Sequence, residues 1–123
     1  MNNQVRLLQR FKTNLINFFD ALIEQLPKEK DLVFIRIMLD TVPMTEAIEV
    51  FSSRILTFRE MVLKRDERFF IECNDLFEGL QKDKVNYFKT LWLSPQLTPD
   101  DKKVIWDWFR VFLAVALGWE SMR

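Results

Sequence analysis

Carboxylates are the side chains of this sequence with the widest chemical scope, since they act as general acids and bases and as metal ligands. Two adjacent pairs stand out, Asp66-Glu67 and Asp100-Asp101. Neighbouring residues on a helix point about 100° apart, so neither pair converges by itself on one metal ion or one substrate atom. Acids in the first turn of a helix interact favourably with the positive end of its dipole, and this structural interpretation is favoured for both pairs.

Histidine, cysteine and glycine are too scarce for the common catalytic and metal sites. The absence of histidine removes the commonest general base, the commonest metal ligand and every Ser-His or Cys-His dyad. The single cysteine, Cys73, cannot supply the several ligands that zinc needs, and it shares a helix face with Phe69 and Phe77, which indicates a buried thiol. Gly79 and Gly118 are too far apart for a phosphate-binding loop. We therefore expect no enzymatic activity, no metal and no cofactor.

A small basic cluster, Lys64, Arg65 and Arg68, offers the candidate phosphate contacts of the sequence. The structural interpretation is that these cations lie at a solvated helix end, where they interact favourably with the negative end of the helix dipole. Asp66 and Glu67 lie inside the cluster and dilute its charge. The whole chain has 18 acidic and 18 basic side chains, whereas nucleic-acid binding depends on an excess of Lys and Arg. Binding to nucleic acid is therefore the alternative function and not the expected one.

Hydrophobic residues recur every three or four positions along almost the whole chain, which predicts helices. With two glycines in 123 residues, the tight turns of sheet hairpins are disfavoured. The expected fold is all-α, a compact single-domain bundle of five or six helices over residues 1–123. Residues 32–38 also include good strand formers, so a strand there is the alternative. Helices are predicted over residues 3–26, 29–40, 44–64, 83–93 and 99–117, with another between Asp66 and Gly79.

The last predicted helix has the clearest start and the widest apolar surface. Thr98-Pro99-Asp100-Asp101 places a hydroxyl at the cap, proline at the first helical position and acids in the first turn. Gly118 is predicted to end this helix. A helix that is apolar nearly all round is buried on several sides, so we expect this one to be largely buried or to meet a partner.

Three residues of this C-terminal region are the candidate partner interface. Trp106 projects about 160° from Trp108 around the helix, so the two cannot serve one simple two-layer contact. We therefore expect Trp106, Leu117 and Trp119 to form an exposed apolar patch of the kind that marks an interface.

Segments 65–70 (RDERFF) and 101–109 (DKKVIWDWF), with Phe18-Phe19 and Trp92, carry a resemblance that extends over most of the chain. In these segments the chain resembles short, uncharacterised helical proteins of large nucleocytoplasmic DNA viruses, mimivirus-like ones among them. That group has no assigned reaction, so no catalytic residue is carried over. The resemblance implies a viral protein in the cytoplasm of the infected host cell, and packaging in the virion is a further expectation.

The function expected from the sequence is that of a non-catalytic helical protein-interaction or structural module. A protein partner or self-association is expected, and no small-molecule ligand is evident. The N-terminus lacks the apolar stretch of a signal peptide, and no run reaches the roughly 18 apolar residues that a membrane span needs. One cysteine among 123 residues fits an intracellular, reducing compartment.

Overall fold

The computed structural model describes residues 3–71 and 89–122. Within these ranges the chain is helical and has no strand, so the all-α class is confirmed and residues 32–38 lie in a helix. The order is α1 (Asn3–Gln25), α2 (Lys30–Met38), a 3-10 turn η1 (Leu39–Thr41), α3 (Met44–Thr57), α4 (Arg59–Leu63), α5 (Arg68–Ile71) and α7 (Pro99–Ser121). Residues 89–93 are also helical, as predicted.

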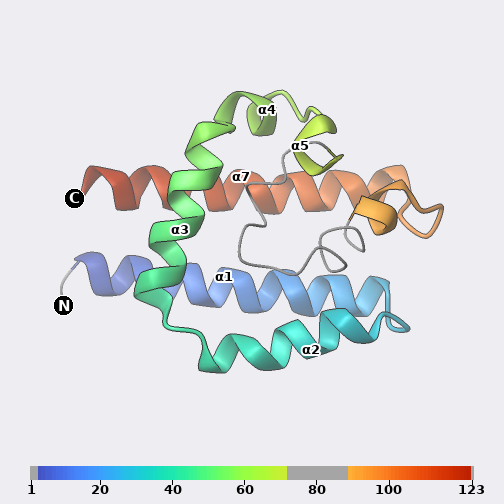
Figure 1. Cartoon of the computed structure of the whole chain (residues 1–123), viewed down its shortest axis with the longest axis horizontal. Coiled ribbons are helices and arrows are strands. Elements are labelled where there is room, and N and C mark those ends of the chain that lie inside the picture. Colours follow the sequence, from blue (N-terminus) through green and yellow to red (C-terminus); the bar gives the residue numbers. More distant parts are fainter. Residues whose placement is uncertain (1–2, 72–88, 123) are drawn as a thin grey trace.

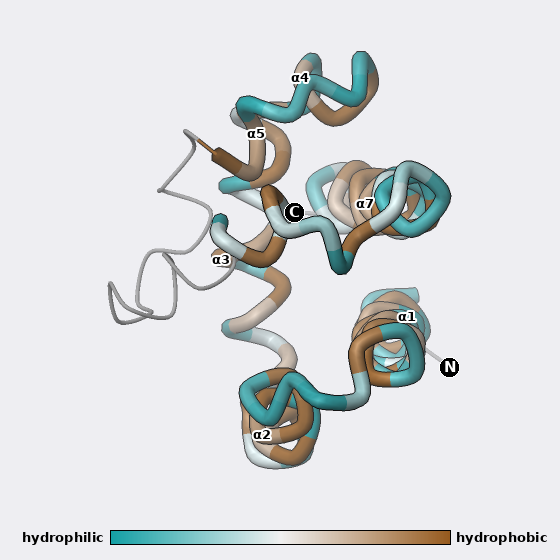
Figure 2. Tube along the Cα trace, turned by 90° about the vertical axis from the view of Figure 1, so that its right-hand side faces the viewer, coloured by the Kyte–Doolittle hydropathy of each residue, from teal (hydrophilic) through white to brown (hydrophobic). Residues whose placement is uncertain are grey.

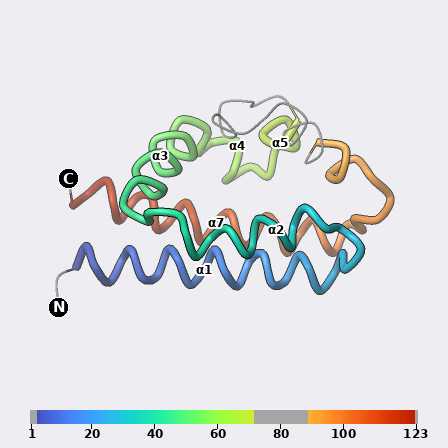
Figure 3. The backbone as a smooth tube through the Cα atoms, turned by 60° about the horizontal axis from the view of Figure 1, so that its bottom comes forward, coloured from blue at the N-terminus to red at the C-terminus, as the bar shows by residue number. Residues whose placement is uncertain are grey.

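Two long antiparallel helices set the arrangement. α1 and α7 run side by side along the length of the molecule, with the start of α1 and the end of α7 at the same end (Figures 1 and 3). α3 crosses both of them and packs on α7 and α1. α4, which follows α3 in the chain, also packs on α7. α2 runs back along α1 at the edge of the molecule (Figures 1 and 2).

The core forms where the apolar stripes of α1, α3 and α7 meet. Phe112 of α7 is its centre, with ring centroids 5.6 Å from Phe18 and 5.6 Å from Phe51. Such edge-to-face pairs suit the aromatic quadrupole. α1 is buried at Phe11, Phe18 and Leu22, and Leu26 directly after it is buried too. Near the N-terminus Leu7 is buried while Leu8 is half-buried, because Leu7 lies one turn before Phe11 on the face toward α7.

The helix predicted over residues 44–64 is divided in two. Phe58 leaves the helical conformation with φ −109° and ψ 21°, so that α3 ends at Thr57 and α4 begins at Arg59. The ring of Phe58 lies 6.2 Å from that of Phe69, in an edge-to-face contact. The apolar stripe continues through the break, because Ile48, Ile55 and Val62 are all buried.

α7 starts as predicted and ends later than predicted. Thr98 Oγ1 accepts a hydrogen bond from the Asp101 backbone N–H at 3.2 Å, and Asp101 Oδ2 accepts one from Thr98 N–H at 3.1 Å. These reciprocal bonds form a capping box with Pro99 in the first turn. Gly118 does not end the helix, which continues to Ser121 because Trp119 packs into the core and so holds the last turn in place.

The remaining predicted elements fall partly outside the described residues. Asp66 caps α5, since its Oδ1 accepts from the Arg68 backbone N–H at 3.1 Å. Leu91 and Trp92 are buried. The predictions for Cys73, Phe77 and Gly79, and for the first part of the helix over residues 83–93, lie outside the described residues.

Candidate functional site

The patch predicted on α7 does not form, because two of its three members are buried within the chain. Trp106 and Trp119 are each only 5% exposed, whereas Leu117 is 48% exposed. Trp106 packs against Phe70 at 4.8 Å and Trp92 at 5.8 Å between ring centroids. α5 and the helical residues 89–93 thus cover the side of α7 that the prediction left for a partner.

Trp119 is held at the other end of α7 by a polar contact as well as by packing. Its indole Nε1 donates a hydrogen bond to Glu49 Oε1 of α3 at 3.0 Å. A buried tryptophan usually has a partner for this N–H, and here Glu49 supplies it. The prediction of an exposed surface at Trp106 and Trp119 is therefore wrong, and both are core residues.

The basic cluster is engaged with carboxylates and connects the α4–α5 junction to α7. Arg65 Nη2 lies 2.6 Å from Asp107 Oδ1, and Arg68 Nη2 lies 2.6 Å from Asp66 Oδ2. The hydrogen bonds from Arg68 hold the pKa of the Asp66 carboxyl below its ordinary value. Lys64 is exposed. Two of the three cations are therefore engaged in ion pairs within the chain, and the phosphate contacts of this cluster stay a prediction.

Arg65 also adopts an unusual backbone conformation at this junction. Its φ of 53° makes it the one non-glycine residue with positive φ among the described residues. The left-handed conformation reverses the chain between α4 and α5, as it does at the ends of many helices. Two ion pairs hold this turn against α7. Arg65 pairs with Asp107, and Lys102 Nζ lies 3.4 Å from Glu67 Oε1.

The carboxylates that the structure describes form no group that could hold a metal ion. Asp66 and Asp101 accept backbone hydrogen bonds at the starts of α5 and α7, and Asp100 is exposed in the first turn of α7. Across residues 3–71 and 89–122, no three Asp, Glu or Cys side chains gather closely enough to hold a metal ion. The described helices also include none that is long and apolar enough to cross a membrane.

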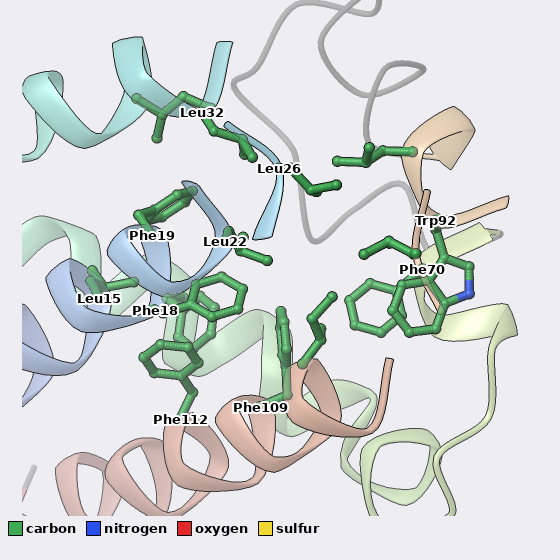
Figure 4. A pocket seen from close by; sticks show the side chains of 15 residues that line it. Leu15, Phe18, Phe19, Leu22, Leu26, Leu32, Phe70, Trp92, Phe109 and Phe112 are labelled. Atoms are coloured by element: carbon green, nitrogen blue, oxygen red, sulfur yellow. The ribbon is translucent and has the colours of Figure 1, made fainter. Parts of the chain in front are cut away.

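An apolar cavity of about 280 Å³ lies between α1, α2, α5 and α7 (Figure 4). Trp92 and Phe70 stack at one end with ring centroids 4.3 Å apart. Its described lining has no charged side chain, and the indole Nε1 of Trp92 has no hydrogen-bond partner within residues 3–71 and 89–122. Such walls supply no acid, base or nucleophile. The lining consists of Leu15, Phe18, Phe19, Leu22, Leu26, Leu32, Ile35, Phe51, Phe70, Leu91, Trp92, Leu97, Ile105, Phe109 and Phe112.

The exposed apolar surface that stands out lies on α2. Phe34 is 59% and Ile37 is 63% exposed, and Val33 and Met38 beside them are exposed too. These four residues are called the α2 outer face below. The opposite side of the helix carries Leu32, which is fully buried. The α2 outer face borders a shallow hollow lined by Pro27, Lys30, Asp31, Val33, Phe34 and Ile37.

Sequence reasoning missed this surface although the signal was present. The spacing of Leu32, Ile35, Met38 and Leu39 predicts one inward stripe, whereas the good strand formers among residues 32–38 favour a strand. Apolar residues on both sides of a short helix are also the pattern of a helix that packs on one side and binds on the other. Met38, predicted inward, is exposed because η1 turns the chain there and only Leu39 reaches the interior.

Comparison of the chain with protein-family models, with curated proteins and with solved structures finds no match. The resemblance to helical proteins of large DNA viruses therefore stays a prediction.

Proposed function

We propose that this protein is a non-catalytic helical protein-interaction module that binds its partner through the α2 outer face. The observation that supports this most directly is the group of four large apolar side chains exposed together on one helix. Exposed apolar surface of a few hundred Å² on a soluble domain typically marks an interaction site. The ion pairs of Arg65 and Arg68 and the absence of charged side chains from the described lining of the cavity are consistent with a function that requires no catalysis.

The rest of the bundle holds α2 in a defined position, which favours binding without large rearrangement. Leu32 and Leu39 anchor the inner side of the α2–η1 segment. On the flank, Arg36 Nε donates to Asp20 Oδ1 of α1 at 2.9 Å. A preorganised surface loses little conformational freedom on association, so more of its burial energy appears as affinity.

Phe34 and Ile37 are the expected anchors of the interface. Fully burying either side chain is worth about 1.5–3 kcal/mol before the costs of association. Aromatic residues at the centre of a patch are also the usual hot spots of protein interfaces. We expect the partner to present a matching apolar surface and not a strongly charged one.

We also propose the number of helices, the position of α7 and the cellular location that the sequence predicts. The bundle has five or six helices, with α7 largely buried at its centre, and α2 is the element that it presents outward. On the resemblance in segments 65–70 and 101–109, the protein acts in the cytoplasm of an infected host cell.

A photo-crosslinking experiment tests the function. A photoreactive phenylalanine analogue replaces Phe34 in one variant and Arg59, an exposed residue of α4, in the matched control. We expect discrete adducts from position 34 in the cell that expresses the protein, and their loss when Ile37→Glu is added. If position 34 gives no more adducts than position 59, the α2 outer face is not a docking surface.

A further inference from the structure

We propose that the partner on the α2 outer face is a second copy of this chain, with the two α2 helices antiparallel across a two-fold axis. The inference depends on the proposed function, because it names the occupant of the same surface. It is carried by the arrangement of charges at the two ends of the apolar patch.

Two residues of opposite charge bracket the α2 outer face along the chain. Lys30 is the first residue of α2, and Asp40 follows the helix in η1. Both are exposed, and neither belongs to an ion pair among residues 3–71 and 89–122. The neighbouring charges are less available, since Asp31 is half-buried and Arg36 is engaged with Asp20.

The positions of these charges have the symmetry that a two-fold contact requires. In such a contact, residue i of one copy meets residue j of the other, and j meets i. Ile35 is midway between Lys30 and Asp40, and two of the four apolar residues precede it while two follow it. Antiparallel helices centred there place each Lys30 beside the other copy's Asp40, with apolar side chains between the two ion pairs.

The parallel arrangement is disfavoured by the same charges. Two parallel α2 helices in register would bring Lys30 toward its own counterpart and Asp40 toward its own counterpart. At the edge of an interface, a contact between like charges destabilises a complex more than a contact between opposite charges stabilises it. The charge pattern therefore selects one orientation, while the apolar side chains supply the affinity.

The size of the patch predicts a weak and reversible dimer. A stable interface buries about 800 Å² on each partner, whereas the α2 outer face is one short helix of 9 residues and offers a few hundred Å². We expect a dissociation constant in the micromolar range, so the monomer and the dimer should both be populated in purified protein.

The first test measures the oligomeric state of the full chain by analytical ultracentrifugation across the micromolar range. We expect concentration-dependent dimerisation that Phe34→Glu abolishes. The matched control is Leu63→Glu on α4, where the side chain is 55% exposed and carries the same change in charge. That variant should dimerise like the wild type, and circular dichroism should show both variants folded.

The second test tells the antiparallel contact from any other. Lys30→Glu and Asp40→Lys should each weaken dimerisation about tenfold, because each homodimer then contains two like-charge contacts. An equimolar mixture of the two variants should dimerise about as strongly as the wild type, because every contact then joins an acid to a base.

The outcomes separate this inference from the proposed function. A wild type that stays monomeric at high micromolar concentration overturns the inference, while adducts between position 34 and a different protein would still support the proposed function. A dimer that survives Phe34→Glu also overturns the inference, because its contact lies elsewhere. A dimer lost in Phe34→Glu but not rescued by mixing the charge variants refutes the antiparallel arrangement.

Discussion

Trp106 provides a direct test of the packing around α7. Its side chain is almost fully buried, with ring contacts to Phe69 at 6.2 Å, Phe70 at 4.8 Å and Trp92 at 5.8 Å. Replacing it by alanine removes all three contacts and leaves a cavity between α5 and α7. Leu117→Ala on the solvent side of the same helix is the matched control, since it also truncates a large apolar side chain to alanine.

The expected loss follows from the burial. Truncating a buried aromatic residue to alanine costs about 3–5 kcal/mol, and each aromatic pair contributes about 0.5–1.5 kcal/mol of that total. Alanine is the best helix former, so the loss cannot come from helix propensity. A domain of this size has about 5–15 kcal/mol of stability. Trp106→Ala should therefore lower the melting temperature by about 10–25 °C.

Urea unfolding followed by far-UV circular dichroism measures the effect. The midpoint should fall strongly for Trp106→Ala with the slope unchanged, which identifies a change of stability and not of compactness. Leu117→Ala should stay within about 0.5 kcal/mol of the wild type. A loss below about 1 kcal/mol for Trp106→Ala would refute the packing described here, and Trp106 would then be a surface residue, as the sequence pattern suggested.

Three further predictions concern helix ends and charge. Gly118→Ala should raise the free energy of unfolding by about 0.5–1 kcal/mol, because glycine inside a helix loses more conformational freedom on folding than alanine. The added Cβ fits, since it would meet Leu7 Cδ2 at an ordinary contact distance of 3.6 Å. A destabilised variant in urea melts would instead indicate that α7 ends there. Thr98→Ala should lower the free energy of unfolding by about 0.5–2 kcal/mol through loss of the capping box, with Thr98→Ser close to wild type as the control. Because the pKa of Asp66 is lowered in the folded state, its stabilising effect is complete above its unfolded pKa and is lost as the pH falls through the folded value. Arg68→Met should raise that pKa in a carboxyl NMR titration, and an unchanged value would show that Arg68 is not the cause.

Several features of the fold could be predicted from the sequence because their causes lie within a few residues. The stripe of Phe11, Phe18 and Leu22 indicates α1 through its spacing alone. The start of α7 follows from Thr98 and Asp101, three residues apart, whose side chains bond each other's backbone N–H groups. Such features need no knowledge of what packs against the helix.

The sequence indicates apolar residues on both sides of α2, but it does not show which side stays exposed, since that depends on which apolar faces the rest of the chain covers. Trp106 and Phe34 are alike in sequence terms, as each is an aromatic residue on a helix with apolar residues on more than one side. Trp106 is buried because Phe70 of α5 and Trp92, which precede it by 36 and 14 residues in the chain, pack on it. Phe34 is exposed because α2 packs chiefly on α1, and no other described helix reaches its outer side. Periodicity determines that a helix has an apolar face, whereas contacts between distant residues decide whether the protein itself buries that face.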